Sequence, residues 1–136
     1  MKDSLLFGYQ LLTGASDTIT GALLILSPAF TSRILSLQVP VDALPYLAFV
    51  GAFVLSVGLG CFYGAWIVYK GDSLNRLGPV WLLTALTRSA VAIFLFTGIL
   101  AGTLEATWLT VAIFDCGLVI FQAVGMRGGW LTDVAR

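Results

Sequence analysis

The sequence predicts an all-α integral membrane protein, a four-helix bundle with a short interfacial helix between the first two spans. Three observations predict this fold: 59% of the 136 residues are hydrophobic, only 10% are charged, and four long apolar blocks are separated by polar connections. Water-soluble domains carry about a quarter charged residues. We therefore expect residues 1–136 to form a single transmembrane domain.

Each apolar block is long enough to cross about 30 Å of hydrocarbon, which takes roughly 20 residues of helix. The expected spans cover residues 5–26, 44–69, 77–100 and 107–124. The connections after the second and third spans are short, so the helices that they join should run antiparallel.

The segment between the first two spans, residues 28–39, has a different pattern. It opens with Pro28, which the first turn of a helix tolerates, and then mixes apolar residues with Thr31, Ser32 and Arg33. This pattern predicts a short helix that lies on the outer membrane interface. Tryptophans near the expected span ends are predicted interfacial anchors: Trp81, Trp108 and Trp130.

Basic residues predict the orientation, because cytoplasmic loops accumulate Lys and Arg. Five of them would lie on the side of the two termini and the second connection: Lys2, Lys70, Arg76, Arg127 and Arg136. Only Arg33 would lie on the opposite side. We expect a bacterial inner-membrane protein with both termini in the cytoplasm.

Composition excludes several kinds of function. There is no histidine, which removes Ser-His-Asp catalysis, His-ligated zinc and the two-His iron site. Seven basic residues balance seven acidic ones, so nothing suggests binding to nucleic acid. Cys61 and Cys116 lie within spans and form no plausible metal site. We expect neither a metal nor a cofactor.

Three charged residues lie near the middle of three different spans: Asp17, Arg88 and Asp115. Each would cost about 2.5–3.5 kcal/mol if it faced lipid at the centre of the bilayer. The three side chains should therefore face the interior of the bundle and meet there.

Other polar residues recur at helical intervals beside these charges, and we expect them to line the same interior. Gln10 and Thr13 share a helix face with Asp17, Thr84 with Arg88, and Gln122 with Asp115; the second span adds Tyr63.

One guanidinium between two carboxyl groups leaves an excess negative charge, which protonation of one carboxyl group would remove. The result is an acid and a base in one polar site. The sequence therefore predicts that Asp17, Arg88 and Asp115 are catalytic, in epoxide opening, isomerisation or cyclisation of a lipophilic small molecule. The expected substrate-binding residues are Gln10, Thr13, Tyr63, Thr84 and Gln122.

Two alternatives use the same residues. The three charges can form a clasp that holds helices in register without any turnover. A titrating carboxyl pair at the midplane also resembles a proton relay.

Small residues follow one another at intervals of four along the second span: Ala52, Ser56, Gly60 and Gly64. Such a stripe allows close approach of a neighbouring helix. The neighbour is either a helix of the same bundle, or a second copy or larger membrane complex for which this chain would be a non-catalytic accessory subunit.

The chain resembles the small four-span bacterial proteins grouped with DoxX-like membrane proteins. The resemblance covers nearly the whole chain and depends on residues 23–28 (Leu-Leu-Ile-Leu-Ser-Pro), the amphipathic stretch 30–37 and the mid-span Arg88. It implies a four-span fold and, through members that are subunits of quinone-linked oxidoreductases, a quinone-linked complex as the partner. A looser similarity is to the four-span sterol isomerase and sigma-2 receptor type, but this chain lacks the histidine of such isomerases.

Overall fold

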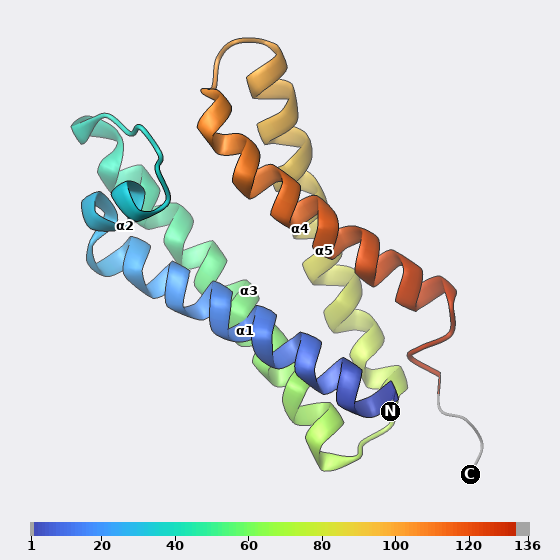
Figure 1. Cartoon of the computed structure of the whole chain (residues 1–136). Helices are drawn as coiled ribbons and strands as arrows, with labels where there is room; N and C mark the ends of the chain where they lie inside the picture. Colours follow the sequence, from blue (N-terminus) through green and yellow to red (C-terminus); the bar gives the residue numbers. More distant parts are fainter. Residues whose placement is uncertain (1, 133–136) are drawn as a thin grey trace. The chain divides into compact units, whose positions relative to one another are not determined.

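A computed structural model describes residues 2–132, and these residues confirm the all-α prediction. Arg136, which entered the charge count, lies outside them. The α-helices of the described residues, labelled in Figure 1, are α1 (Lys2–Leu26), α2 (Pro28–Ile34), α3 (Leu44–Lys70), α4 (Leu77–Leu100) and α5 (Leu109–Arg127). Short 3-10 turns precede the last three, at Val41–Ala43, Leu74–Arg76 and Ala106–Trp108.

The described residues fall into two compact units, one ending at Lys70 and the other beginning at Gly71. The prediction of one domain over residues 1–136 stays a prediction. Within residues 2–132, three segments are long and apolar enough to cross a membrane: Val41–Lys70, Leu74–Leu100 and Ala106–Arg127. Helix α1, with 25 residues and a length of about 37 Å, contains more polar residues and is not among these three.

In the described residues, large apolar side chains are exposed and several polar side chains are buried, as expected for a protein surrounded by hydrocarbon. Many large apolar side chains are exposed on the four long helices, among them Leu12, Phe53, Leu83 and Ile113. The buried residues include nine polar or charged ones: Gln10, Thr13, Asp17, Thr31, Ser32, Thr84, Arg88, Asp115 and Gln122. A water-soluble domain buries apolar groups and keeps charged groups at its surface. The combination of an apolar core, buried charges and many exposed large apolar side chains indicates a membrane protein.

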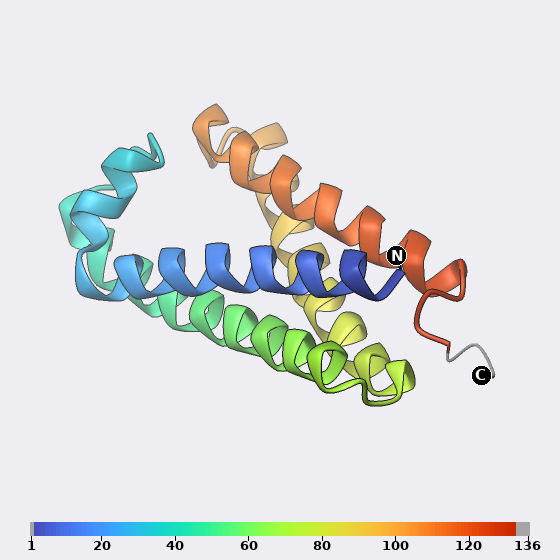
Figure 2. The ribbon, with the colours of Figure 1, turned by 60° about the horizontal axis from the view of Figure 1, so that its bottom comes forward.

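In the first unit, glycines bring the backbones of α1 and α3 together (Figure 2). A Cβ atom on Gly21 would lie 2.7 Å from Leu55 Cα and 2.8 Å from the Gly51 carbonyl oxygen. A Cβ atom on Gly58 would lie 2.5 Å from the Thr18 backbone nitrogen. No side chain fits at these positions, so the packing of the two helices depends on glycine.

Within the first unit, most of the stripe of Ala52, Ser56, Gly60 and Gly64 lies outside the contact with α1, and whether it meets another helix of the bundle or a partner stays a prediction. Helix α1 contacts α3 through Gly51 and Gly58 instead, while Ala52 and Ser56 are exposed and a Cβ atom on Gly60 would meet nothing within 4 Å. Gly64 is buried. Residues seven apart return to one helix face with little drift, whereas a spacing of four moves steadily around the helix. Ala52, Ser56 and Gly60 therefore do not contact α1.

Helix α2 is shorter than the expected segment 28–39, because the chain turns at Ser36. Ser36 has a φ of 56°, its N–H donates to the Arg33 carbonyl, and the Leu37 N–H donates to the Ser32 carbonyl at 2.8 Å. These two bonds form a Schellman motif, which ends a helix. Thr31 and Ser32 are buried; the Thr31 hydroxyl donates to the carbonyl oxygen of Ser27, just before α2, and the Ser32 hydroxyl to that of Ala29.

Replacing Ser36 by glycine is expected to stabilise the protein by about 1 kcal/mol, since a left-handed conformation costs a non-glycine residue roughly that much. Gly102 has the same role after α4, with a φ of 71° and no atom within 4 Å of an added Cβ. Gly102→Ala should therefore lower the free energy of unfolding by about the same amount, about 1 kcal/mol. Unfolding in mixed micelles measures both changes. If both substitutions changed the free energy of unfolding by the same amount in the same direction, the left-handed conformation would not be the cause.

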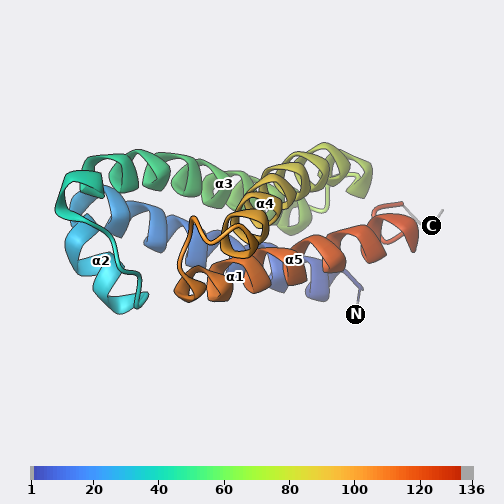
Figure 3. The ribbon, with the colours of Figure 1, turned by 90° about the horizontal axis from the view of Figure 1, so that it is seen from above.

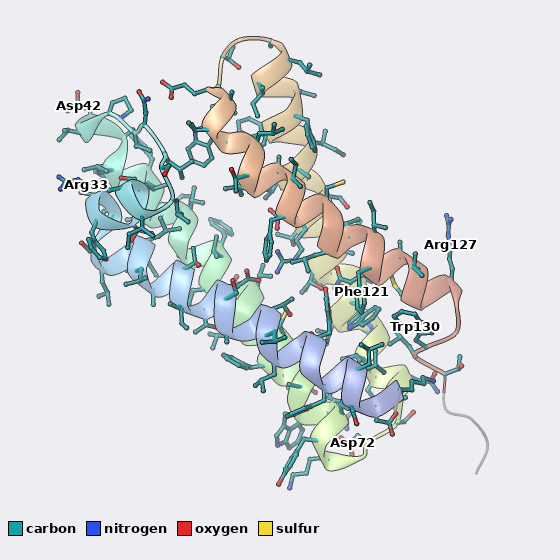
Figure 4. All side chains as sticks on the ribbon, viewed as in Figure 1. Arg33, Asp42, Asp72, Phe121, Arg127 and Trp130 are labelled. Atoms are coloured by element: carbon teal, nitrogen blue, oxygen red, sulfur yellow. The ribbon has the colours of Figure 1, made fainter. Side chains whose placement is uncertain are left out.

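In the second unit, α4 and α5 pack against each other along a seam, joined by the loop after Leu100 (Figure 3). At the loop end Leu104 fills the space beside Gly98, where a Cβ atom would lie 2.5 Å from Leu104 Cδ1. At the other end the chain turns at Gly129 and returns Trp130 to α5, where its ring packs against Phe121 with centroids 5.4 Å apart (Figure 4).

The expectation that Trp81 is an interfacial anchor is wrong. Its side chain is 0% exposed, packs beside Phe121 with ring centroids 6.0 Å apart, and would lie 2.6 Å from a Cβ atom on Gly125. A ring enclosed in this way presents no surface to lipid headgroups. Trp81 is a core residue, because glycine on α5 leaves room for the indole.

Candidate functional site

A buried ion pair joins the two helices of the second unit. Arg88 on α4 donates from Nη1 to Asp115 Oδ1 on α5 at 2.5 Å, and the side chains are only 6% and 12% exposed. Arginine keeps its charge in any environment that a protein provides, so it holds a carboxylate here that would otherwise be costly to bury. The contact between these two charges, expected from their positions in the sequence, is present.

A second polar pair follows along the same seam. Gln122 on α5 donates from Nε2 to the hydroxyl oxygen of Thr84 on α4, at 2.7 Å. Because the helices are antiparallel, Thr84 and Arg88, one turn apart on α4, face Gln122 and Asp115, two turns apart on α5. Four of the predicted site residues therefore form one polar stretch inside the second unit.

Apolar residues close this polar stretch at both ends. On one side Trp81 packs beside Gly125, and on the other Ala92, Leu95 and Ala112 are buried. In buried surroundings of this kind, hydrogen bonds and charges interact more strongly than in water. The Arg88–Asp115 ion pair therefore lies in surroundings that strengthen it.

Three predicted residues lie on one face of α1 in the first unit. Gln10, Thr13 and Asp17 are all buried, and the Thr13 hydroxyl donates to the Tyr9 carbonyl oxygen at 2.8 Å. The structure thus gives α1 a polar buried face and an apolar exposed one. That Asp17 meets Arg88 and Asp115, which belong to the other unit, stays a prediction.

Tyr63 is not placed among the buried polar residues. Its side chain is 48% exposed on α3 and stacks on Trp66, with ring centroids 6.0 Å apart. Neighbouring positions on α3, Cys61 and Gly64, point to the buried side instead. A single tyrosine in an apolar span gives no periodic signal of its own, which is why its face could not be assigned from the sequence.

Trp81 is a neighbour of the polar stretch that was not predicted from the sequence. Trp81 precedes Thr84 by three residues and so shares its helix face. This three-residue interval could have placed Trp81 beside the polar residues, but its position near the end of the expected span favoured an interfacial anchor instead. Within residues 2–132, no three acidic or cysteine side chains come together as a metal site would require.

Comparison of the chain with protein-family models, with curated proteins and with solved structures gives no match, so the geometry of the polar stretch is the basis for a function.

Proposed function

We propose that this protein is a small polytopic membrane protein that binds a lipophilic small molecule at a polar site formed by Asp17, Arg88 and Asp115. The observation that supports it most is the buried Arg88–Asp115 ion pair in a chain whose exposed surface is apolar. Ionisable residues inside a membrane are expensive, and they mark binding sites and proton pathways more often than they serve structure alone.

Two features favour a ligand over a simple clasp. The polar stretch contains an amide and a hydroxyl beside the ion pair, which a clasp does not need. Helix α1 likewise buries Asp17 and two further polar side chains on one face, which the proposal adds to the site. A lipophilic molecule with one polar end would place that end against these groups and its apolar body against the surrounding helices.

The same site can support acid/base chemistry. A carboxylate held by Arg88 can take a proton, and a second, protonated carboxyl group can give one. With Asp17 as the partner of Asp115, one carboxylate would take a proton from a water molecule whose oxygen forms the new C–O bond, while the protonated carboxyl group gives its proton to the epoxide oxygen as the ring C–O bond breaks. For an alkene, the pair would remove a proton from one carbon and return one to another. In this proposal Asp17 and Asp115 exchange protons with the substrate and Arg88 holds the developing charge.

The proposal includes α1 as a fourth span. At about 37 Å it is long enough, and its exposed side carries large apolar residues such as Leu5, Leu12 and Ile19. With four spans both termini lie on one side, which the basic residues near them identify as the cytoplasm of a bacterial cell.

Conservative replacement of each charge tests the proposal. Protein purified in mild detergent from its own membranes is extracted with organic solvent, and the extract is analysed by mass spectrometry. A lipophile recovered from the wild type should fall at least about tenfold in Asp17→Asn, Arg88→Gln and Asp115→Asn, since a hydrogen bond to a charged group contributes about 1.5–3 kcal/mol. Arg76→Gln, in an exposed ion pair, is the matched control. Unchanged recovery from all three folded variants would refute a binding role.

A double-mutant cycle tests whether Asp17 belongs to the site. If Asp17 and Arg88 interact, the free energies of unfolding of Asp17→Asn and Arg88→Gln should differ from additivity by about 0.5–3 kcal/mol. Additivity within about 0.3 kcal/mol would separate Asp17 from the cluster.

A second candidate is a non-catalytic accessory subunit of a larger, quinone-linked membrane complex. It is favoured by the exposure of Ala52 and Ser56 and by the open space at Gly60, which leave part of the small-residue stripe available to another helix. Purification as a solitary monomer with no co-purifying membrane protein would contradict it.

A further inference from the structure

The Gln122 side chain has one polar atom that the described residues leave without a hydrogen bond. Gln122 is 0% exposed, and its Nε2 donates to Thr84, yet its Oε1 is buried and has no partner among residues 2–132. A buried acceptor without a donor costs about as much as several ordinary hydrogen bonds contribute. The amide is therefore the group in the polar stretch most in need of a further partner.

Thr84 determines which end of the amide needs that partner. A threonine hydroxyl has one proton, and Thr84 donates its proton to the Val80 carbonyl oxygen at 2.8 Å, with the Trp81 carbonyl 3.2 Å away. The hydroxyl can then only accept from Gln122. Nε2 must face Thr84, so Oε1 faces away and offers an acceptor, not a donor.

We propose that Gln122 Oε1 accepts a hydrogen bond from the ligand, so that the site selects lipophilic alcohols over molecules whose polar end is only an acceptor. The proposal rests on the proposed function and specifies its ligand class. Thr84, which holds the amide, lies one helical turn, about 6 Å, from Arg88 on α4, so the proposed contact belongs to the same polar stretch as the ion pair.

The preference for alcohols over ethers follows from the cost of placing two hydrogen-bond acceptors against each other. An ether oxygen in place of the hydroxyl would put two acceptors opposite each other in a dry interior, and the amide cannot turn to present Nε2 without giving up Thr84. A water molecule could satisfy Oε1 equally well, but then the site would not distinguish an alcohol from an ether.

Two isomeric probes test the proposal on the full-length protein in detergent: 1-tetradecanol, which has a donor, and methyl tridecyl ether, which does not. Binding is followed by tryptophan fluorescence. We expect the wild type to bind the alcohol about tenfold more tightly than the ether, the size of one neutral hydrogen bond. Gln122→Met, which keeps the length of the side chain without its acceptor, should reduce this preference to about twofold or less.

A second variant acts through the orientation of the amide. Thr84→Val removes the hydroxyl and lets the amide turn either way, so the preference should fall to within about threefold. Thr97→Val is the matched control, because Thr97 on α4 makes the same hydroxyl bond, to the Ile93 carbonyl at 2.8 Å, on the exposed side of the helix. It should keep the tenfold preference.

Each contrary result has a definite meaning. Binding of both probes with equal affinity to the wild type would overturn the role of Gln122 Oε1 and leave the proposed function standing. Binding of neither probe to the wild type would overturn the role together with lipophile binding. A preference that survives in both Gln122→Met and Thr84→Val would assign the selectivity to other residues.

Discussion

Replacing Gly58 with alanine is expected to destabilise the protein by about 2–3 kcal/mol, the cost of inserting atoms into a filled interior. The new Cβ atom would meet the backbone nitrogen of Thr18 at 2.5 Å and the carbonyl carbon of Asp17 at 3.0 Å. Backbone atoms of a helix cannot turn away as a side chain can, so α1 and α3 must move apart. Their separation would weaken contacts along much of the first unit.

Gly60 provides a control two residues further along the same helix. A Cβ atom there would meet nothing within 4 Å, and alanine is a better helix former than glycine by about 1 kcal/mol. Gly60→Ala should therefore leave stability unchanged or raise it, which is the opposite sign to Gly58→Ala. Free energies of unfolding from denaturation in mixed micelles distinguish the two. Similar losses at both positions would mean that helix flexibility, and not the α1 contact, requires these glycines.

Removing the arginine of the buried ion pair should have the largest effect of any single polar substitution. Arg88→Leu leaves the Asp115 carboxylate buried without its guanidinium, and breaking a buried pair in this way costs about 3–5 kcal/mol. The double variant Arg88→Leu/Asp115→Leu should recover most of this loss, because two apolar residues of similar size need no compensation. Unfolding of the three proteins under one set of conditions provides the comparison.

The exposed pair of Arg76 and Asp72 is a matched control for burial. Its atoms are 2.6 Å apart, close to the buried pair, but the side chains are 54% and 34% exposed. Arg76→Leu should cost less than about 1 kcal/mol. If Arg88→Leu costs no more than Arg76→Leu, the interior is wetter than its exposed fractions indicate. A double variant that regains stability but yields no lipophile would separate the site's chemistry from the fold.

The helices and their limits could be predicted closely because they follow from local patterns. Helix α4 covers residues 77–100 and α3 covers 44–70, within one residue of the expected blocks. Helix α2 ended earlier than expected, since Ser36 occupies a left-handed position that glycine or asparagine would normally announce. The sequence offered no such warning at Ser36.

Four residues of the polar stretch, Thr84, Arg88, Asp115 and Gln122, could be predicted from the sequence, whereas Tyr63, expected beside them, lies on the exposed side of its helix. A charge in the middle of an apolar span is recognisable wherever it occurs, and this sufficed to select Arg88 and Asp115. Thr84 orients the Gln122 amide because α4 and α5 pack in one particular register. The sequence of either helix alone does not determine that register.

The sequence alone was enough to predict the helices, the apolar segments and the charged residues that must avoid lipid. Each of these features depends on residues only a few positions apart. Tertiary packing was needed to show that α1 rests on Gly51 and Gly58, not on the neighbouring small residues, and that Trp81 is buried beside Gly125. Which face of a helix is covered depends on the shape of the surface that meets it. That shape comes from residues on another helix, so it emerges only when the two are packed together.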